Sequence, residues 1–230
     1  MSENGKEVIL AIDQGTTGSK ALLLDSDLSV LAEASREFPQ HFPEPGQVEH
    51  DLDEIFQSVR DSVTAALETA GVKASSIAAV GITNQRETTA IWRAEDGRPI
   101  HRAIVWQDRR TAAKCRELKE AGHEDLFREK TGLVLDPYFS GTKIAWLLEE
   151  IEGARAMAEA GELRFGTIDT FLCWKLSGGA AHVTDISNAS RTLLMDLESP
   201  DWDEDLLDIL GVPATLLPEI RDNDSVFAQT

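Results

Sequence analysis

The chain has 230 residues, of which 42% are hydrophobic and 27% charged, and its formal net charge is −19. This composition is typical of a globular protein with a substantial core, and no stretch approaches the ~20 apolar residues of a membrane span. The excess of 41 acidic over 22 basic residues argues against nucleic acid or an anionic membrane as a partner, since both require clustered Lys and Arg. A phosphorylated ligand is still compatible, because a few local donors and Mg²⁺ can hold a phosphate.

The N-terminal residues 1–7 are polar and contain no apolar segment of a secretory signal. The two cysteines, Cys115 and Cys173, are far apart in sequence and fit no metal-binding spacing. These features predict a cytoplasmic protein with reduced thiols.

The first predicted element is a hairpin, with apolar strands at residues 8–12 and 21–25 and a polar turn between them. Gly15 and Gly18 let the backbone approach a ligand closely and tolerate positive φ angles. Successive backbone N–H groups in such a turn form a concavity that binds anions. The candidate phosphate-binding residues are Thr16, Thr17, Gly18, Ser19 and Lys20.

Asp13, at the end of the first strand, is the candidate Mg²⁺ ligand, because Mg²⁺ prefers oxygen ligands and keeps several waters. The turn differs from a Walker A loop, which runs into a helix, since here one strand leads to another. An ordinary hairpin rich in glycine and threonine is the alternative. These residues alone do not distinguish a phosphate-binding turn from an ordinary hairpin, so other segments of the chain are needed.

The next elements are predicted from hydrophobic periodicity and from glycine and proline positions. A strand is expected at residues 29–38, a loop at 40–46, a helix at 53–70 ended by Gly71, a strand at 77–83, and a hairpin of strands at 88–93 and 100–106. Farther along, helices are expected at 109–121, 124–131, 140–151, 153–160, 168–176 and 202–210, an extended step at 164–166, and an ordered polar loop at 183–191. Strands first and helices later favour an α/β or α+β domain built around a sheet.

Polar residues 84–87 follow directly on the predicted strand at 77–83. Ligands of open α/β sheets bind at the carboxyl ends of strands. Arg86 offers a planar set of donors and Glu87 an acceptor, a combination that suits neighbouring hydroxyls of a small polyol. A strand-exit loop with a surface ion pair is the alternative.

Two aromatic residues are further candidates. Trp106 ends an apolar strand, where its ring can form the wall of a small pocket and pack against carbon atoms. Tyr138 precedes a predicted helix and can present its hydroxyl to a ligand. The alternatives are a core tryptophan and an aromatic anchor, with Ser140 as the helix N-cap. The polar segment 184–191 is interpreted as a structural network.

Residues 84–89 (NQRETT) and 104–111 (IVWQDRRT) are specific enough to indicate a family, and residues 13–17 (DQGTT) agree with them. With these segments the chain resembles the N-terminal half of the glycerol kinases, in the FGGY family of sugar kinases, over nearly its whole length. The resemblance implies a ribonuclease-H-like, actin-like ATPase fold with a mixed central sheet flanked by helices. It also implies ATP- and Mg²⁺-dependent phosphorylation of glycerol to sn-glycerol 3-phosphate.

The resemblance assigns roles to the residues already singled out. The residues implied to bind glycerol are Arg86, Glu87, Trp106 and Tyr138. Those implied to approach the nucleotide phosphates are Thr16, Thr17 and Gly18, with Asp13 in the Mg²⁺ site. Gly18 and Lys20 depart from the Ser and Arg common in the family, and Lys lacks the bidentate fork of Arg.

Members of the family are roughly twice as long as this chain, consistent with two domains of ordinary size. Residues 1–230 are therefore expected to be the N-terminal, substrate-binding domain. The aspartate that acts as general base and most of the adenosine pocket are expected in a C-terminal nucleotide-binding domain that this chain lacks. We expect the chain alone to be catalytically inactive and to bind glycerol weakly, and the full-length form to be a homo-oligomer.

Two alternatives stay open. The first is a kinase for another polyol or sugar such as xylulose, although Arg86 and Glu87 paired with Trp106 favour glycerol, since a larger sugar needs a different wall. The second is a short, non-catalytic module for ligand binding or protein interaction.

Overall fold

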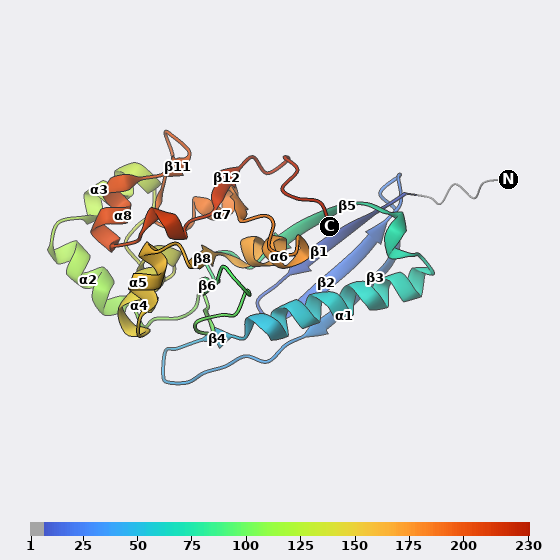
Figure 1. The fold of residues 1–230 in the computed structure, drawn as a ribbon, viewed down its shortest axis with the longest axis horizontal. Coiled ribbons are helices and arrows are strands. Elements are labelled where there is room, and N and C mark those ends of the chain that lie inside the picture. Colours follow the sequence, from blue (N-terminus) through green and yellow to red (C-terminus); the bar gives the residue numbers. More distant parts are fainter. Residues whose placement is uncertain (1–6) are drawn as a thin grey trace. The chain divides into compact units, whose positions relative to one another are not determined.

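The computed structural model describes residues 7–230. The expectation that residues 1–7 contain no secretory signal therefore concerns a segment that lies almost wholly outside the described residues. The chain divides into two compact units (Figure 1). The first comprises residues up to Gln40 together with Asp51–Gln85, and the second comprises His41–His50 and Arg86–Thr230. In the described part of the chain, no helix combines the length and the apolar character needed to cross a membrane.

The first unit is a four-stranded mixed sheet in the order β3-β2-β1-β5. Its strands are β1 (Val8–Gln14), β2 (Gly18–Leu24), β3 (Val30–Glu37) and β5 (Ile77–Asn84). β1 pairs antiparallel with β2 and parallel with β5. The predicted hairpin is confirmed, and its strands are longer than expected, so the turn contracts to residues 15–17. The mixed sheet expected from the resemblance is confirmed as well.

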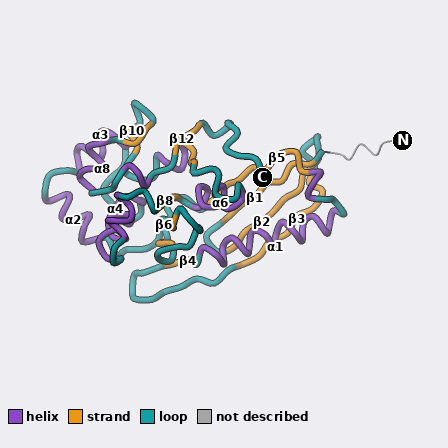
Figure 2. Tube along the Cα trace, in the orientation of Figure 1, coloured by secondary structure: helices purple, strands orange, loops and turns teal. Residues whose placement is uncertain are grey.

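The long helix α1 (Leu52–Ala70) packs along β2 and β3 (Figure 2). The Asp51 carboxylate accepts hydrogen bonds from the first backbone N–H groups of the helix, and Gly71 ends it with a φ of 63°. Ile55 and Val59 lie on the buried stripe of α1, as the periodicity predicts. This packing holds β2, and with it the exit of the polar turn, against a rigid element.

Gly18 is required by close packing. A Cβ atom at this position would lie 2.8 Å from the Arg36 carbonyl oxygen of β3. Neither Gly15 nor Gly18 adopts the positive φ angle that a glycine tolerates. The strand bonding of β2 on both sides fixes an extended backbone where a free turn was expected.

The second unit combines helices with short strand pairs. Its helices are α2 (Ala112–Glu120), α3 (Glu124–Thr131), α4 (Ser140–Glu150), α5 (Ala154–Glu159), α6 (Ile168–Leu176), α7 (Ile186–Ala189) and α8 (Glu204–Leu210). The strand pairs are β4 (Glu49–His50) with β7 (Ala103–Ile104), β6 (Ala90–Arg93) with β8 (Leu163–Gly166), β9 (Val183–Asp185) with β12 (Glu219–Arg221), and β10 (Met195–Asp196) with β11 (Asp201–Trp202). Two 3₁₀ turns, Ala74–Ser76 in the first unit and Ala214–Leu216 in the second, complete the described elements.

The main core of the second unit collects buried residues from α3, α4, α8 and β8, among them Phe127, Ile144, Phe165 and Leu206. Every helix that the sequence predicts in this region is present, with ends shifted by a few residues. Eight residues of α4 are buried. Ser140 and Lys143, near its N-terminal end, contribute to the site described below.

One prediction about the second unit is confirmed in part and another is wrong. The expected hairpin of residues 88–93 and 100–106 is joined by isolated antiparallel bridges, Thr89–Ile104 and Trp92–Pro99, and by further backbone hydrogen bonds between its two segments. The same segments also pair with distant strands, β6 with β8 and β7 with β4, which the sequence did not predict. The expected loop at 183–191 contains β9 and α7, because the Asp185 carboxylate caps α7 by accepting from Asn188 N at 2.7 Å.

Candidate functional site

The residues predicted to bind the polyol all belong to the second unit, which places them in one body. Arg86 and Glu87 lie before β6, Trp106 follows β7, and Tyr138 precedes α4. Glu87 is the centre of the arrangement, since separate elements contact its main chain and its carboxylate.

Glu87 adopts a left-handed backbone conformation with a φ of 62°, although it is not a glycine. A hydrogen bond of 2.7 Å from Thr88 N to Arg86 O closes a γ-turn around it. Such a conformation costs about 1–2 kcal/mol for a residue with a Cβ atom and persists where the surroundings over-determine it. The turn leaves Arg86 exposed, while Glu87 is 2% exposed.

The Glu87 carbonyl oxygen accepts from several donors. The Ser140 hydroxyl donates to it at 3.0 Å, the Thr89 hydroxyl at 3.1 Å and Lys143 Nζ at 3.4 Å. Ser140 therefore does not act as the N-cap of α4, because that position belongs to Phe139 and no side chain caps it. These donors hold the strained turn in place.

The Glu87 carboxylate is paired with Arg191, whose Nε donates to Oε1 at 2.7 Å. The Arg191 guanidinium lies over the Phe139 ring at 4.9 Å and over the Tyr138 ring at 5.9 Å. The Tyr138 ring in turn lies 5.4 Å from that of Trp106. The structure thus joins Glu87, Tyr138 and Trp106 through Arg191. Sequence reasoning missed this role, since Arg191 is the last residue of the polar segment 184–191, which was interpreted as a structural network.

Lys143 is the second residue that sequence reasoning missed. Its side chain is fully buried, and Nζ also donates to the carbonyls of Tyr138 at 2.6 Å and Phe139 at 3.2 Å. Burial lowers the pKa of Lys143 to about 7, against the opposing effect of the Asp108 and Glu87 carboxylates. The available signal in the sequence was a lysine within the otherwise apolar run of α4.

A buried charge network anchors the segment that carries Trp106. Asp108 accepts from Val48 N at 2.7 Å, and Arg110 Nη2 lies 2.9 Å from Asp108 Oδ2 and 2.8 Å from Glu49 Oε1. The Arg110 guanidinium also lies 4.6 Å from the centre of the Trp146 ring. Charge-assisted bonds of this kind fix orientation as well as distance. The loop after β7 is therefore tied to β4, and the position of Trp106 is fixed with it.

Arg86 differs from these residues. Its side chain is exposed, and within residues 7–230 its guanidinium has no hydrogen-bond or ionic partner. All its N–H donors are available to a ligand.

The candidate phosphate-binding turn lies in the first unit, between β1 and β2. Gly15 N donates to Gly18 O at 2.9 Å and closes it. Asp13 and Thr17 are exposed and Thr16 is half-buried. These residues present oxygen atoms and backbone groups at the carboxyl end of β1, where a phosphate ligand can approach.

Ser19 and Lys20 have partners inside the first unit. The Ser19 hydroxyl is buried against α1 and lies 2.7 Å from the Ser58 hydroxyl. Lys20 Nζ lies 2.7 Å from Glu33 Oε2 of β3. The geometry gives no support to phosphate contacts by these two side chains, because α1 and β3 already bind them. The role of the other turn residues stays a prediction.

Two buried glutamines form hydrogen bonds to the turn and to each other. Gln14 is fully buried, and its Nε2 donates to Gly15 O at 2.6 Å. Gln85, at the end of the neighbouring strand β5, donates from Nε2 to Gln14 Oε1 at 3.2 Å. Neither glutamine was predicted from the sequence to have this role.

A metal at this turn would have to be held mainly by water and phosphate oxygens. Across the described residues, no group of three His, Cys, Asp or Glu side chains is arranged to hold a metal ion. Asp13 is a single exposed carboxylate, which fits Mg²⁺, an ion that keeps several waters and is commonly bound through one or two carboxylates and substrate phosphates.

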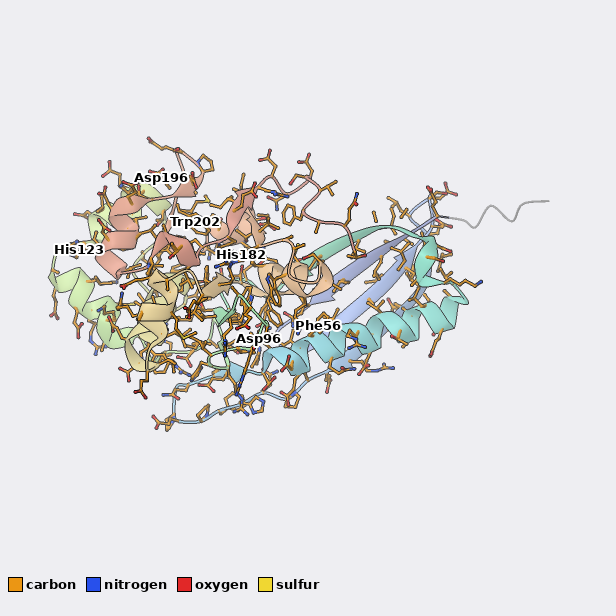
Figure 3. All side chains as sticks on the ribbon, viewed as in Figure 1. Phe56, Asp96, His123, His182, Asp196 and Trp202 are labelled. Atoms are coloured by element: carbon orange, nitrogen blue, oxygen red, sulfur yellow. The ribbon has the colours of Figure 1, made fainter. Side chains whose placement is uncertain are left out.

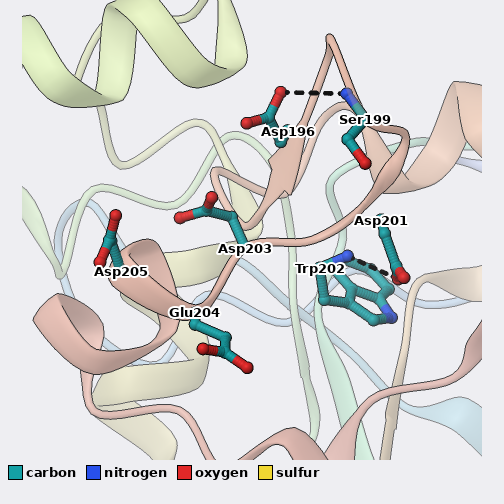
Figure 4. A pocket seen from close by; sticks show the side chains of 7 residues that line it. All are labelled: Asp196, Ser199, Asp201, Trp202, Asp203, Glu204 and Asp205. Atoms are coloured by element: carbon teal, nitrogen blue, oxygen red, sulfur yellow. Dashed lines mark hydrogen bonds between the residues drawn. The ribbon is translucent and has the colours of Figure 1, made fainter.

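A separate hollow lies near the β10–β11 hairpin, where Figure 3 labels Asp196 and Trp202. Its volume is about 390 Å³, and its lining is acidic apart from a serine and a tryptophan (Figure 4). Lys130 Nζ lies 2.6 Å from Asp203 and 2.7 Å from Asp205, so part of this negative charge is already paired. None of the predicted site residues lines this hollow.

The chain is similar to known carbohydrate kinases both in sequence and in structure. The model for the FGGY family of carbohydrate kinases, N-terminal domain, matches residues 8–230. A glycerol kinase of Methylobacterium nodulans is 57% identical over 223 residues, which are 97% of this chain and 44% of the relative. A crystal structure of Plasmodium falciparum glycerol kinase with ADP has a TM-score of 0.90 at 34% identity, covering 97% of this chain and 44% of that one.

A gluconate kinase from Lactobacillus acidophilus has a TM-score of 0.87 at 26% identity, covering 97% of this chain and 43% of its own. The chain therefore spans less than half the length of the relatives that it matches.

Proposed function

Because the chain belongs to the FGGY family of carbohydrate kinases, we propose that it provides the polyol-binding part of a glycerol kinase. In this proposal ATP phosphorylates glycerol to sn-glycerol 3-phosphate. The single observation that carries it is the joined group of Glu87, Arg191, Tyr138 and Trp106 in the second unit. An acceptor, donors and an aromatic wall within one body match the surface of a small polyol.

Each residue has a distinct task in this proposal. The exposed Arg86 donates to glycerol hydroxyls, and the Glu87 carboxylate, oriented by Arg191, accepts from them. The Tyr138 hydroxyl adds a further contact, and the Trp106 ring packs against the carbon atoms. These contacts bind and orient the alcohol, and orientation is a large part of catalysis in phosphoryl transfer.

ATP and Mg²⁺ are part of the same proposal. The turn at residues 15–17 offers backbone N–H groups and the Thr16 and Thr17 hydroxyls to nucleotide phosphates, and Asp13 suits a water-mediated contact with Mg²⁺. When bound, Mg²⁺ neutralises phosphate charge that develops during transfer. The general base for the glycerol hydroxyl is proposed to lie in the part of the relatives that this chain does not span.

Substrate choice is tested by saturation-transfer NMR of the chain with glycerol, xylulose and gluconate in turn. We expect signal from glycerol and a weaker or absent signal from the larger ligands, because the wall formed by Trp106 and Tyr138 suits a short carbon chain. A preference for xylulose or gluconate would replace glycerol by the second candidate substrate. Absence of any signal would favour a non-catalytic module.

Cytoplasmic localisation and homo-oligomer formation by the longer protein remain predictions of the proposal. Light scattering of the purified protein gives its mass in solution and checks the second of them directly. The acidic balance of the chain, −19 at neutral pH, keeps nucleic acid and anionic membranes outside the proposal.

A further inference from the structure

We propose that Lys143 is a positioning residue of the polyol site, which it shapes by joining two chain segments through their carbonyl groups. This inference rests on the proposed function for its consequence and on the structure alone for its geometry. Nζ donates to Glu87 O on one segment and to Tyr138 O and Phe139 O on the other. Glu87 and Lys143 are 56 residues apart in sequence, so the joined segments are not neighbours along the chain.

The burial of Lys143 indicates that its side chain does more than fill space in the core. Its exposed fraction is 0%, and no ion pair with a carboxylate within 4.0 Å is found for it among residues 7–230. An amino group taken out of water is costly unless it is hydrogen-bonded, and an apolar residue of similar length would fill the space without that cost. What Lys143 provides and an apolar residue cannot is a set of N–H donors at one point.

The acceptors of those donors are the main-chain groups that orient the site. Glu87 is held in a γ-turn that its own conformational preference opposes. Tyr138 and Phe139 lie immediately before α4, where no side chain caps the helix. Lys143 reaches back from the end of the first turn of α4 and satisfies these carbonyls. It thereby sets the position of the Tyr138 ring relative to Glu87.

The same segments carry the side chains that the proposal assigns to glycerol. The Glu87 carboxylate and the Tyr138 ring are both contacted by Arg191, so a shift of either segment changes the shape of the site. Loss of Lys143 therefore acts on ligand binding through position, without removing any group that touches the ligand.

The test compares Lys143→Met with Ile144→Ala in the 230-residue chain. Ile144 is the next residue on α4, is fully buried, and faces the main core, so its truncation destabilises the unit without touching these carbonyls. Lys143→Gln is the milder second variant, because it keeps N–H donors without the charge. Amide hydrogen exchange is followed by mass spectrometry at residues 86–89 and 136–140, and glycerol binding by calorimetric titration.

We expect Lys143→Met to raise exchange at both segments above the rise that Ile144→Ala causes, and to weaken glycerol binding by about 10-fold or more. Lys143→Gln should show the same pattern to a smaller degree. If both segments exchange as in the wild type in either folded variant, Lys143 is not a positioning residue. Unchanged glycerol affinity in Lys143→Met would overturn the inference equally.

Failure of the proposed function gives a different pattern. If the wild-type chain binds no glycerol while both segments still loosen in the Lys143 variants, the glycerol assignment fails and the positioning role of Lys143 stands. If the wild type binds glycerol and the variants bind it as tightly, the positioning role fails and the glycerol assignment stands.

Discussion

Glu87 shows how a single residue can combine an unfavourable backbone conformation with a buried charge. Its φ of 62° and its carboxylate, 3% exposed, are both maintained by partners from α4 and from the segment after α7. Sequence reasoning selected Glu87 from its chemistry and its place after a strand. It could not select Arg191 or Lys143, because their partners are 104 and 56 residues away in the chain.

Replacing Arg191 by methionine should leave the buried Glu87 carboxylate without its cation. We expect Arg191→Met to lower the free energy of unfolding by more than about 1 kcal/mol, because an unsatisfied buried polar group costs about 1–3 kcal/mol and a charged one costs more. Urea denaturation measures it. Arg86→Ala is the matched control, because Arg86 is exposed and its loss should change stability by less than about 0.5 kcal/mol. Equal effects of the two substitutions would show that the Glu87–Arg191 pair does not stabilise the unit.

His182 predicts a pH dependence of stability. Burial lowers its pKa to about 4; a hydrogen bond to the Phe165 carbonyl opposes this shift, and Arg164 contributes to it. Between pH 6.5 and about 4 the unfolded chain then binds a proton that the folded chain does not, so stability falls as the pH falls through this window. His182→Gln should reduce that fall, measured as urea midpoints at pH 7 and pH 4.5.

The pH dependence of stability should be reduced in His182→Gln, but it should not vanish entirely. The pKa of His50 is likewise lowered to about 4 by burial, with a contribution from His41, and acts in the same direction. Asp169 acts in the opposite direction, because burial raises its pKa to about 6 and favours the folded state at low pH. An unchanged slope in His182→Gln would contradict the account of this residue.

At the scale of elements, local signals were sufficient where one segment determines its own structure. α1 has a capping aspartate, an apolar stripe and a terminal glycine, and its predicted bounds differ from the observed ones by one residue at the start. The short strands of the second unit could not be paired from sequence, since β6 finds β8 some 70 residues later in the chain. The candidate site depends on those distant pairings and on α4.

The packing of α4 makes a prediction at this scale. Gly141 N donates to Thr192 O at 2.6 Å, and a Cβ atom at Gly141 would lie 2.7 Å from that oxygen and 2.8 Å from Leu210 Cδ1. Gly141→Ala must therefore push α4 away from the segment that follows Arg191, at a cost of about 1–3 kcal/mol. Thermal and urea denaturation check the loss of stability.

Gly81→Ala is the control for this substitution. Gly81 lies in β5, and a Cβ atom there would meet no atom within 4 Å, so we expect little change in stability. If Gly141→Ala were as stable as Gly81→Ala, the close approach of α4 to residues 192–193 would not be a constraint on the fold.

At the scale of the whole molecule, the chain contains the proposed polyol site and a candidate phosphate turn but spans less than half the length of its relatives. Phosphoryl transfer needs groups that position the alcohol, the phosphates and the metal together. We therefore expect the purified chain, given ATP, Mg²⁺ and glycerol, to form no sn-glycerol 3-phosphate above background. A coupled assay for this product checks the expectation, and steady product formation would show that the chain already holds a general base.

Calorimetric titration with glycerol, beside the Arg86→Ala variant, tests our proposal that this chain alone carries a preformed glycerol site. Arg86 is suited to this comparison because it is exposed, so its replacement removes donors while leaving the fold intact. We expect saturable binding to the wild type and its loss in Arg86→Ala. No binding to the wild type, or equal binding to both proteins, would rule out the proposed site in this chain.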